Sequence, residues 1–255
     1  TSSLVGSEMC IRDRFNGMPP QQMGMTPPPP MGATPPQQMG MTPPPPMGAT
    51  PPQPMGSTGG ARPGVVSLSK GQKVSLSKVA PSLVRMMVGL GWDTQKYSGA
   101  QDFDLDASVF LCGANDRCDP SNFIFYNNLR GINDCVVHQG DNRTGEGEGD
   151  DETIMVDLSK VPPEITKIAV TVTIFEADTR HQNFGMISNA FIRLVNLDTN
   201  QEVIRYDLGE DFSIETALVV AELYRSGADW KFSAVGAGFS GGLKALCANY
   251  GIDAE

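Results

Sequence analysis

The feature that most constrains the fold is a period-two alternation of apolar side chains that recurs from Pro63 to the C-terminus. Every second residue in 168–174 is Ile or Val, and every second residue in 105–111 is Leu, Ala or Val. The stretch from Val84 to Trp92 alternates in the same way. Because successive side chains of a strand point to opposite faces, this pattern predicts half-buried β-strands.

Further strands are predicted from apolar, β-branched runs separated by turn-forming sequences near Asp198 and Ser226. These strands cover 123–126, 154–158, 190–196, 202–208, 217–225 and 230–235. Many short strands at spacings of about ten residues are typical of a sandwich. We therefore expect residues 63–255 to form one all-β domain, an antiparallel β-sandwich.

A short C-terminal helix is the one helix that the sequence predicts. Ser240 is its expected N-cap, and Gly251 follows as a C-terminal stop. Its apolar stripe has the spacing i, i+3, i+4, i+7 and consists of Leu243, Leu246, Cys247 and Tyr250. We expect this stripe to cover one of the sheets.

Residues 1–62 differ from the rest of the chain and are predicted to be a disordered tail rich in Met, Gly, Pro and Gln. The tail holds 15 of the 20 prolines and nine of the 13 methionines. Residues 23–38 are repeated at 39–54 with one difference, Gln38 against Pro54. Such a segment cannot bury enough apolar surface to offset its ordering entropy, and four-proline runs favour polyproline II. We interpret the tail as a spacer; the alternative is a ligand for a domain that binds Pro-rich segments.

Residues 1–14 resemble neither the repeat nor the domain. They read TSSLVGSEMCIRDR and contain no initiator methionine. The string looks like a translated sequencing adapter, so we treat 1–14 as a non-native segment and draw no functional argument from it.

The charge of residues 63–255 excludes several classes of protein. This part holds 16 Lys and Arg against 27 Asp and Glu, a net charge of −11. Nucleic acid is therefore not an expected partner, since its affinity comes mostly from basic side chains on phosphates. No apolar run approaches the roughly 18 residues of a transmembrane segment. Five cysteines without C-x-x-C spacing fit a reducing compartment and ordinary thiols better than a disulfide framework or a zinc site.

The first acidic cluster is Asp102, Asp104 and Asp106, interleaved with Phe103 and Leu105. In a strand, residues two apart share a face, so three carboxylates would lie side by side with the apolar residues packed behind. Carboxylates this close repel one another unless a cation intervenes. The cluster therefore suggests a cation site, and a solvated strand face is the alternative.

The second acidic cluster runs from Gly140 to Glu152 and reads GDNRTGEGEGDDE. Alternating glycines let the backbone bend so that carboxylates and carbonyls can converge on one point. Several hard oxygen ligands per ion are what Ca²⁺ takes, and no soft ligand is present. The candidate ligands in this cluster are Asp141, Asn142, Thr144, Glu146, Glu148, Asp150 and Asp151; the alternative is a charged disordered loop.

Neither cluster is an EF-hand, because glycine and the third ligand fall at the wrong positions of the 12-residue window. A β-sandwich brings loops together at one end, so we expect the two clusters to combine across space. The two histidines, His138 and His181, lie outside any recognised catalytic motif, and we attribute both to loop polarity.

The residues from about Gly64 to Asp253 resemble the TerD family of tellurium-resistance and stress-response domains. The resemblance is carried by VSLSKGQKVSLSK at 66–78, VGLGWD at 88–93, DFDLDASVFL at 102–111 and HQGDNRTGEGEGDDE at 138–152. It implies a β-sandwich that binds Ca²⁺ through acidic loops, without enzymatic activity. It also implies a role in resistance to tellurite and other stresses, in the cytoplasm or peripherally at the inner membrane face with other Ter-type proteins. Glu148 stands where the family often has Asp, which keeps the charge on a longer side chain.

From these observations we expect a non-enzymatic, calcium-binding stress-response protein. One alternative is a Ca²⁺-dependent adaptor that bridges to anionic membrane lipid or to partner proteins. A second is a cyclic-nucleotide-binding relative of the same family, although nothing in the sequence resembles a nucleotide pocket. A third is a hydrolase that uses the same carboxylates with Mg²⁺ or Mn²⁺.

Overall fold

The computed structural model describes residues 64–94, 103–140, 150–208 and 212–253. The predicted tail, including its repeat and residues 1–14, lies outside the described residues. So do Asp102 and the middle of the second acidic cluster, 141–149.

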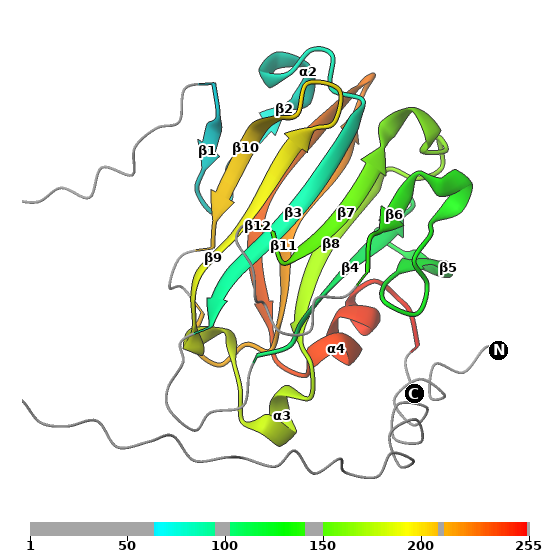
Figure 1. Cartoon of the computed structure of the whole chain (residues 1–255). Helices are drawn as coiled ribbons and strands as arrows, with labels where there is room; N and C mark the ends of the chain where they lie inside the picture. Colours follow the sequence, from blue (N-terminus) through cyan, green and yellow to red (C-terminus); the bar gives the residue numbers. More distant parts are fainter. Residues whose placement is uncertain (1–63, 95–102, 141–149, 209–211, 254–255) are drawn as a thin grey trace, which may run out of the picture. The chain divides into compact units, whose positions relative to one another are not determined.

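Two six-stranded sheets pack face to face, which confirms the predicted β-sandwich (Figure 1). Sheet A has the order β1-β10-β9-β3-β7-β6: Val66–Leu68, Gln201–Asp207, Ile187–Asn196, Arg85–Thr94, Glu152–Asp157 and Val136–His138. Sheet B has the order β2-β12-β11-β8-β4-β5: Lys73–Ser75, Asp229–Phe239, Ala217–Ser226, Lys167–Ile174, Leu105–Cys112 and Cys118–Ile124. Neighbouring strands are antiparallel except β1, which pairs with β10 in parallel.

The core lies between the two sheets and is lined by the alternating residues of each strand. Met86, Val88, Leu90 and Trp92 of β3 are buried in it, as the alternation predicts. Val84 is 41% exposed, because β3 begins only at Arg85. The predicted strand therefore started one residue too early.

Strands β4 and β8 are buried on both faces rather than half-buried. Leu105, Ala107, Val109 and Leu111 of β4 face the core between the sheets. The other face of β4, which includes Phe110, is covered too, since a helix packs on the outside of sheet B.

That helix is α4, Gly242–Asn249, and its apolar residues cover sheet B as expected (Figure 1). Gly251, with a φ of 78°, ends it as predicted. The predicted cap is wrong: Gly241 is the N-cap residue, and no side chain of the helix itself caps it. Instead the backbone N–H groups of Gly241 and Gly242 donate to the Thr216 hydroxyl, at 3.1 and 3.0 Å. Thr216 lies just before β11, so the cap comes from a distant part of the sequence.

Several short elements were not predicted, because each is too short to show a period. They are β1, β2, β6, the helices α2 (Leu76–Val79) and α3 (Ala177–Arg180), and the 3₁₀ turns η1 (Ile132–Asp134), η2 (Leu158–Lys160) and η3 (Phe184–Met186).

The described parts of the two acidic clusters lie at one end of the sandwich, which we call the acidic end; it comprises the start of β4, the end of β6 and the start of β7 (Figure 1). In sheet B, Leu105 at the start of β4 pairs with Ile174 at the end of β8. In sheet A, Glu152 at the start of β7 pairs with Leu90, near the end of β3. The elements that flank the two clusters therefore lie at the same end, and the combination of the clusters across space stays a prediction.

Candidate metal site

The second acidic cluster connects β6 to β7, and the structure describes both of its stems. On one side the N–H of Gln139 donates to the carbonyl of Thr153 at 3.0 Å. On the other the N–H of Asp151 donates to the carbonyl of Leu90 at 2.7 Å, which ties the stem to β3. The described residues on both sides of 141–149 are thus held at fixed points.

His138 fixes the first stem from inside the sandwich. Its Nδ1 accepts the N–H of Gly140 at 3.1 Å, so Nε2 carries the ring proton. Nε2 lies 3.1 Å from the carbonyl oxygen of Ala107 on β4 and 3.1 Å from the carboxylate of Glu152. His138 and Glu152 are both buried, so one imidazole joins the two stems and links sheet A to sheet B. Loop polarity was therefore the wrong interpretation of His138; His181, at the end of α3, is exposed.

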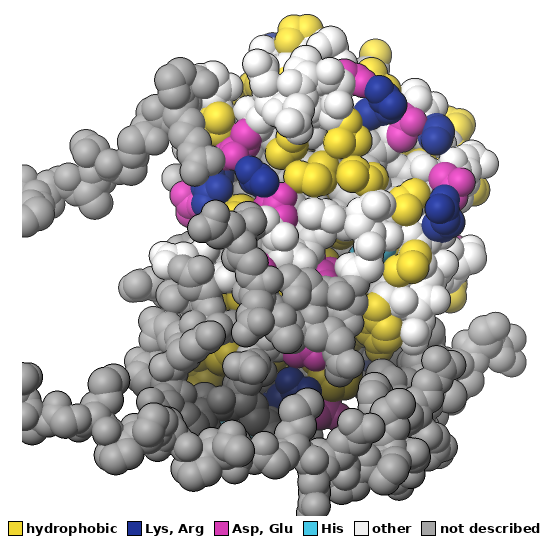
Figure 2. All heavy atoms as spheres, in the orientation of Figure 1, with side chains coloured by type: hydrophobic (Ala, Val, Ile, Leu, Met, Phe, Trp, Pro, Cys, Tyr) yellow, Lys and Arg dark blue, Asp and Glu magenta, His cyan; other side chains and the backbone are white. Residues whose placement is uncertain are grey.

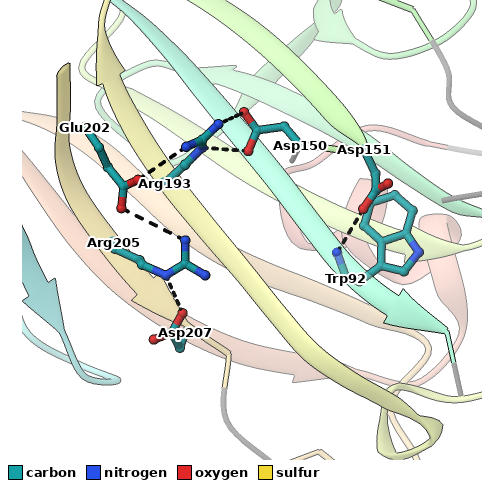
Figure 3. A network of polar contacts seen from close by, with 7 residues as sticks. All are labelled: Trp92, Asp150, Asp151, Arg193, Glu202, Arg205 and Asp207. Atoms are coloured by element: carbon teal, nitrogen blue, oxygen red, sulfur yellow. Dashed lines mark hydrogen bonds and ion pairs between the residues drawn. The ribbon is translucent and has the colours of Figure 1, made fainter. Parts of the chain in front are cut away.

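Asp150 is held by Arg193 of β9 through two parallel hydrogen bonds (Figure 3). Nε donates to Oδ1 at 2.7 Å and Nη2 donates to Oδ2 at 2.9 Å. Hydrogen bonding to Asp150 raises the pKa of Arg193 above its ordinary value. The carboxylate lies directly over Gly89, where any Cβ would overlap it. A glycine at position 89 is therefore what lets Asp150 reach across β3 to Arg193.

The ion pair extends along the outer face of sheet A as a ladder of alternating charge (Figure 3). Arg193 also reaches Glu202 at 3.3 Å, and Arg205 lies 4.0 Å from Glu202 and 2.8 Å from Asp207. Arg205 in turn stacks over the ring of Phe191, with its Cζ 3.8 Å from the ring centroid. Figure 2 shows basic and acidic side chains side by side on this face rather than in separate patches.

Asp151 points away from Asp150 and towards the end of β3 (Figure 3). Its Oδ2 accepts the backbone N–H of Trp92 at 2.9 Å. The indole of Trp92 is 5% exposed and belongs to the core between the sheets. Asp151 therefore ties the second stem to the backbone of β3 beside a buried core residue.

The first acidic cluster lies at the start of β4. Phe103 and Leu105 are buried, as predicted, but Asp104 is buried too, with 7% of its surface exposed. Its carbonyl accepts the N–H of Phe175 at 2.8 Å. Asp106 lies within β4 opposite Thr173, on the side of the strand that also carries Phe110 and faces away from the core.

Four of the predicted ligands are described, and they lie in different parts of the sandwich: Asp104, Asp106, Asp150 and Asp151. Arg193 draws Asp150 to the outer face of sheet A, whereas Asp106 lies on the outer side of sheet B, so these two do not meet. Asp104 and Asp151 are at the acidic end near the core. Asp102, Asp141, Asn142, Thr144, Glu146 and Glu148 lie outside the described residues. Within the described ranges, no group of three or more His, Cys, Asp or Glu side chains is arranged to hold a metal ion.

Sequence reasoning missed the residues that position the acidic segment: Gly89, Trp92, His138, Glu152 and Arg193. Glu152 sits in the acidic run but alternates inward with Ile154 and Val156, a signal for burial that the sequence does contain. Arg193 is a charged residue inside an apolar strand pattern, and a charged side chain in such a position is usually paired with an opposite charge. Nothing in the sequence says that this partner is Asp150, 43 residues away.

Comparison with known proteins identifies the family of this chain. Residues 65–250 match the family model described as the TerD domain. The chain belongs to the TerD family. General stress protein 16U of Bacillus subtilis is 58% identical over 188 residues, which cover 73% of this chain and 97% of that protein. Tellurium resistance protein TerD of Serratia marcescens is 57% identical over 191 residues, 74% of this chain and 99% of that protein.

The TerD fold is also seen in a solved structure, the crystal structure of a homologue of the tellurium-resistance protein TerD from Streptomyces coelicolor. That chain superposes with a TM-score of 0.55 at 24% identity, over 68% of this chain and all of its own length. In the part of the TerD chain that the structure describes, no helix is long and apolar enough to cross a membrane.

Proposed function

We propose that this TerD-family protein is a non-enzymatic, calcium-binding stress protein of the tellurium-resistance type. Family membership and the names of its relatives support the stress and tellurium-resistance part. The observation that carries the calcium part is the anchoring of the acidic segment: both of its stems are fixed by specific contacts at the acidic end. A merely solvated acidic loop needs no such anchoring.

The donor chemistry supports Ca²⁺ rather than a softer ion. The segment 141–149 offers carboxylate, amide and hydroxyl oxygens only, and Ca²⁺ takes about six to eight oxygen ligands. Asp141, Asn142, Thr144, Glu146 and Glu148 would hold the ion together with Asp104 and Asp151. A bound Ca²⁺ would offset the mutual repulsion of these carboxylates. Asp150, already paired with Arg193, would act as the anchor of the segment.

Calcium titration of the full chain tests this proposal. Ca²⁺ at about 100 times its dissociation constant stabilises a protein by about 2.7 kcal/mol, which corresponds to about 5–10 °C in melting temperature for a domain of this size. We expect that shift, together with binding heat in calorimetry, and its loss in EDTA. The proposal is wrong if saturating Ca²⁺ leaves the melting temperature unchanged and calorimetry shows no heat of binding.

Two carboxylate variants make the test specific. Asp104→Asn removes a buried charge at the acidic end and is expected to weaken binding at least tenfold. Asp198→Asn is the matched control, because Asp198 pairs with Arg85 at the opposite end of the sandwich. Equal affinities of the two variants would exclude Asp104 from the site.

A Ca²⁺-dependent adaptor for anionic lipid is the second candidate, and one observation favours it. Met186 and Ile214 are 47% and 70% exposed, on neighbouring segments at the acidic end. Apolar side chains beside a cation site would insert into a membrane whose headgroups bind the ion. The calcium-loaded and EDTA-treated samples are therefore also sedimented with phosphatidylserine vesicles. Binding that needs Ca²⁺ and is lost in Ile214→Ser, but kept in Leu197→Ser at the opposite end, would support the adaptor.

A further inference from the structure

The described part of the protein contains four free cysteines, and three of them share one small apolar cluster. Cys112, Cys118 and Cys247 lie between α4 and the outer face of sheet B, with Phe110 and Tyr250 around them. Neither the calcium proposal nor the sequence analysis gives these thiols a role.

Two of the three thiols stand directly opposite each other on neighbouring strands: Cys112 on β4 pairs with Cys118 on β5. The N–H of Gly113 donates to the carbonyl of Arg117 at 3.0 Å. The N–H of Cys118 points outward to the carbonyl of Tyr250, and the carbonyl of Cys112 accepts the N–H of Thr166, both at 2.9 Å. The two cysteines therefore form a non-hydrogen-bonded pair of the antiparallel ladder.

This type of pair has the geometry that a disulfide needs. In non-hydrogen-bonded pairs the Cα atoms are about 4.5 Å apart and the side chains share a face of the sheet. Disulfides span Cα separations of about 4.4–6.8 Å. Hydrogen bonding to Cys112, together with burial, raises the pKa of the Cys118 thiol above its ordinary value.

We propose that Cys112 and Cys118 are a redox-active dithiol that closes to a cross-strand disulfide when the protein meets a small-molecule disulfide. The Cys118 thiolate attacks the small disulfide, forms a mixed disulfide and releases one thiol. The Cys112 thiolate then attacks the sulfur of Cys118 and releases the second thiol. The protein loses two electrons and two protons, and the small disulfide gains them as two thiols.

The position of the pair decides which sulfur reacts first. β5 is the edge strand of sheet B, and the turn 114–117 beside it is exposed. Cys118 is 5% exposed and Cys112 is fully buried, so the oxidant meets Cys118 first, when the end of the hairpin opens. Because only a thiolate attacks, the reaction is slow at neutral pH and accelerates as pH rises.

Tryptic peptide mapping detects this disulfide directly, since Arg117 separates the two cysteines. The full-length reduced protein is incubated with oxidised glutathione, alkylated under denaturing conditions and digested. We expect peptide 97–117 linked to peptide 118–130, each of which holds one cysteine. The link should disappear after reduction. Closing the short loop should raise the melting temperature by about 3–8 °C.

Single cysteine variants distinguish this pair from the other thiols. Cys247→Ala removes a buried thiol of the same cluster and should still form the linked peptides. In the Cys112→Ala variant, the exchange reaction should stop at a glutathione adduct on Cys118, and the melting temperature should not rise. A link from Cys118 to Cys247, or a wild-type protein in which Cys112 and Cys118 both stay reduced, would overturn the proposal. The wild-type peptide map decides the question even if a variant fails to fold.

Discussion

At the scale of single residues, the acidic end depends on one ion pair that joins distant strands. The side chain of Asp150 is 5% exposed, and both of its oxygens are bonded to Arg193. Removing one partner of a buried pair costs more than the pair itself contributes, because the other charge stays desolvated. Arg193 is 27% exposed, so water screens part of this cost.

Arg193→Ala should therefore lower the free energy of unfolding by about 1–3 kcal/mol. Arg205→Ala is the matched control: it belongs to the same ladder, but its closest carboxylate, Asp207, is 71% exposed. We expect a loss below about 1 kcal/mol for the control. Urea unfolding of both variants measures the difference, and equal losses would contradict an anchoring role for Arg193.

At the scale of elements, α4 decides how much of sheet B is buried. It turns the outer faces of β4 and β8, which would otherwise meet solvent, into a second apolar cluster. Its start is held by the Thr216 hydroxyl, which accepts two backbone N–H groups and is itself buried. Ser240, the residue that the sequence favours as a cap, lies just before the helix and makes no cap.

Thr216→Ala should destabilise the protein by about 1 kcal/mol, the usual cost of a lost cap. Thr216→Ser keeps the hydroxyl and should retain most of the stability. Ser240→Ala should be neutral. Thermal unfolding of the three variants tests the assignment, and a larger loss in Ser240→Ala than in Thr216→Ala would reverse it.

The elements show where sequence reasoning succeeds and where it fails. The long strands β3, β4 and β8 carry enough residues for their alternation to be read, and β11 and β12 are recognisable as apolar, β-branched runs. The strands β1, β2 and β6 have three residues each, which is too few to show an alternation. They are extended because they pair with neighbouring strands. For the candidate site, the acidic spacing singled out two segments whose flanking elements lie at one end of the sandwich, but it said nothing about Arg193 or His138, which act through contacts with distant segments.

At the scale of the whole molecule, the pKa values of two buried thiols reflect the exclusion of water by the fold. Cys135 lies in the core between the sheets and Cys247 on the buried face of α4, and both are buried. Burial raises the pKa of each thiol to about 11, above the value of 9.0 for an exposed thiol. The folded state thus holds these protons more tightly than the unfolded state.

This difference makes stability depend on pH in the alkaline range. The stabilisation is fully present below pH 9 and is lost as pH rises towards 11, because the unfolded chain then releases protons that the folded chain keeps. The free energy of unfolding from urea melts should fall across this range. The double variant Cys135→Ala, Cys247→Ala should show a shallower fall, and an unchanged slope would argue against these thiols as its source.

The sandwich, its apolar C-terminal helix and the oxygen-rich acidic segment can be predicted from the sequence, because alternation, helical spacing and ligand chemistry are properties of neighbouring residues. The three-dimensional fold was needed to find that Asp150 is paired, that His138 is buried between the stems, that Thr216 caps α4 and that Cys112 faces Cys118. Each of these depends on strand register or on packing between the sheets. Such contacts join residues that the chain order keeps apart, so no local pattern encodes them.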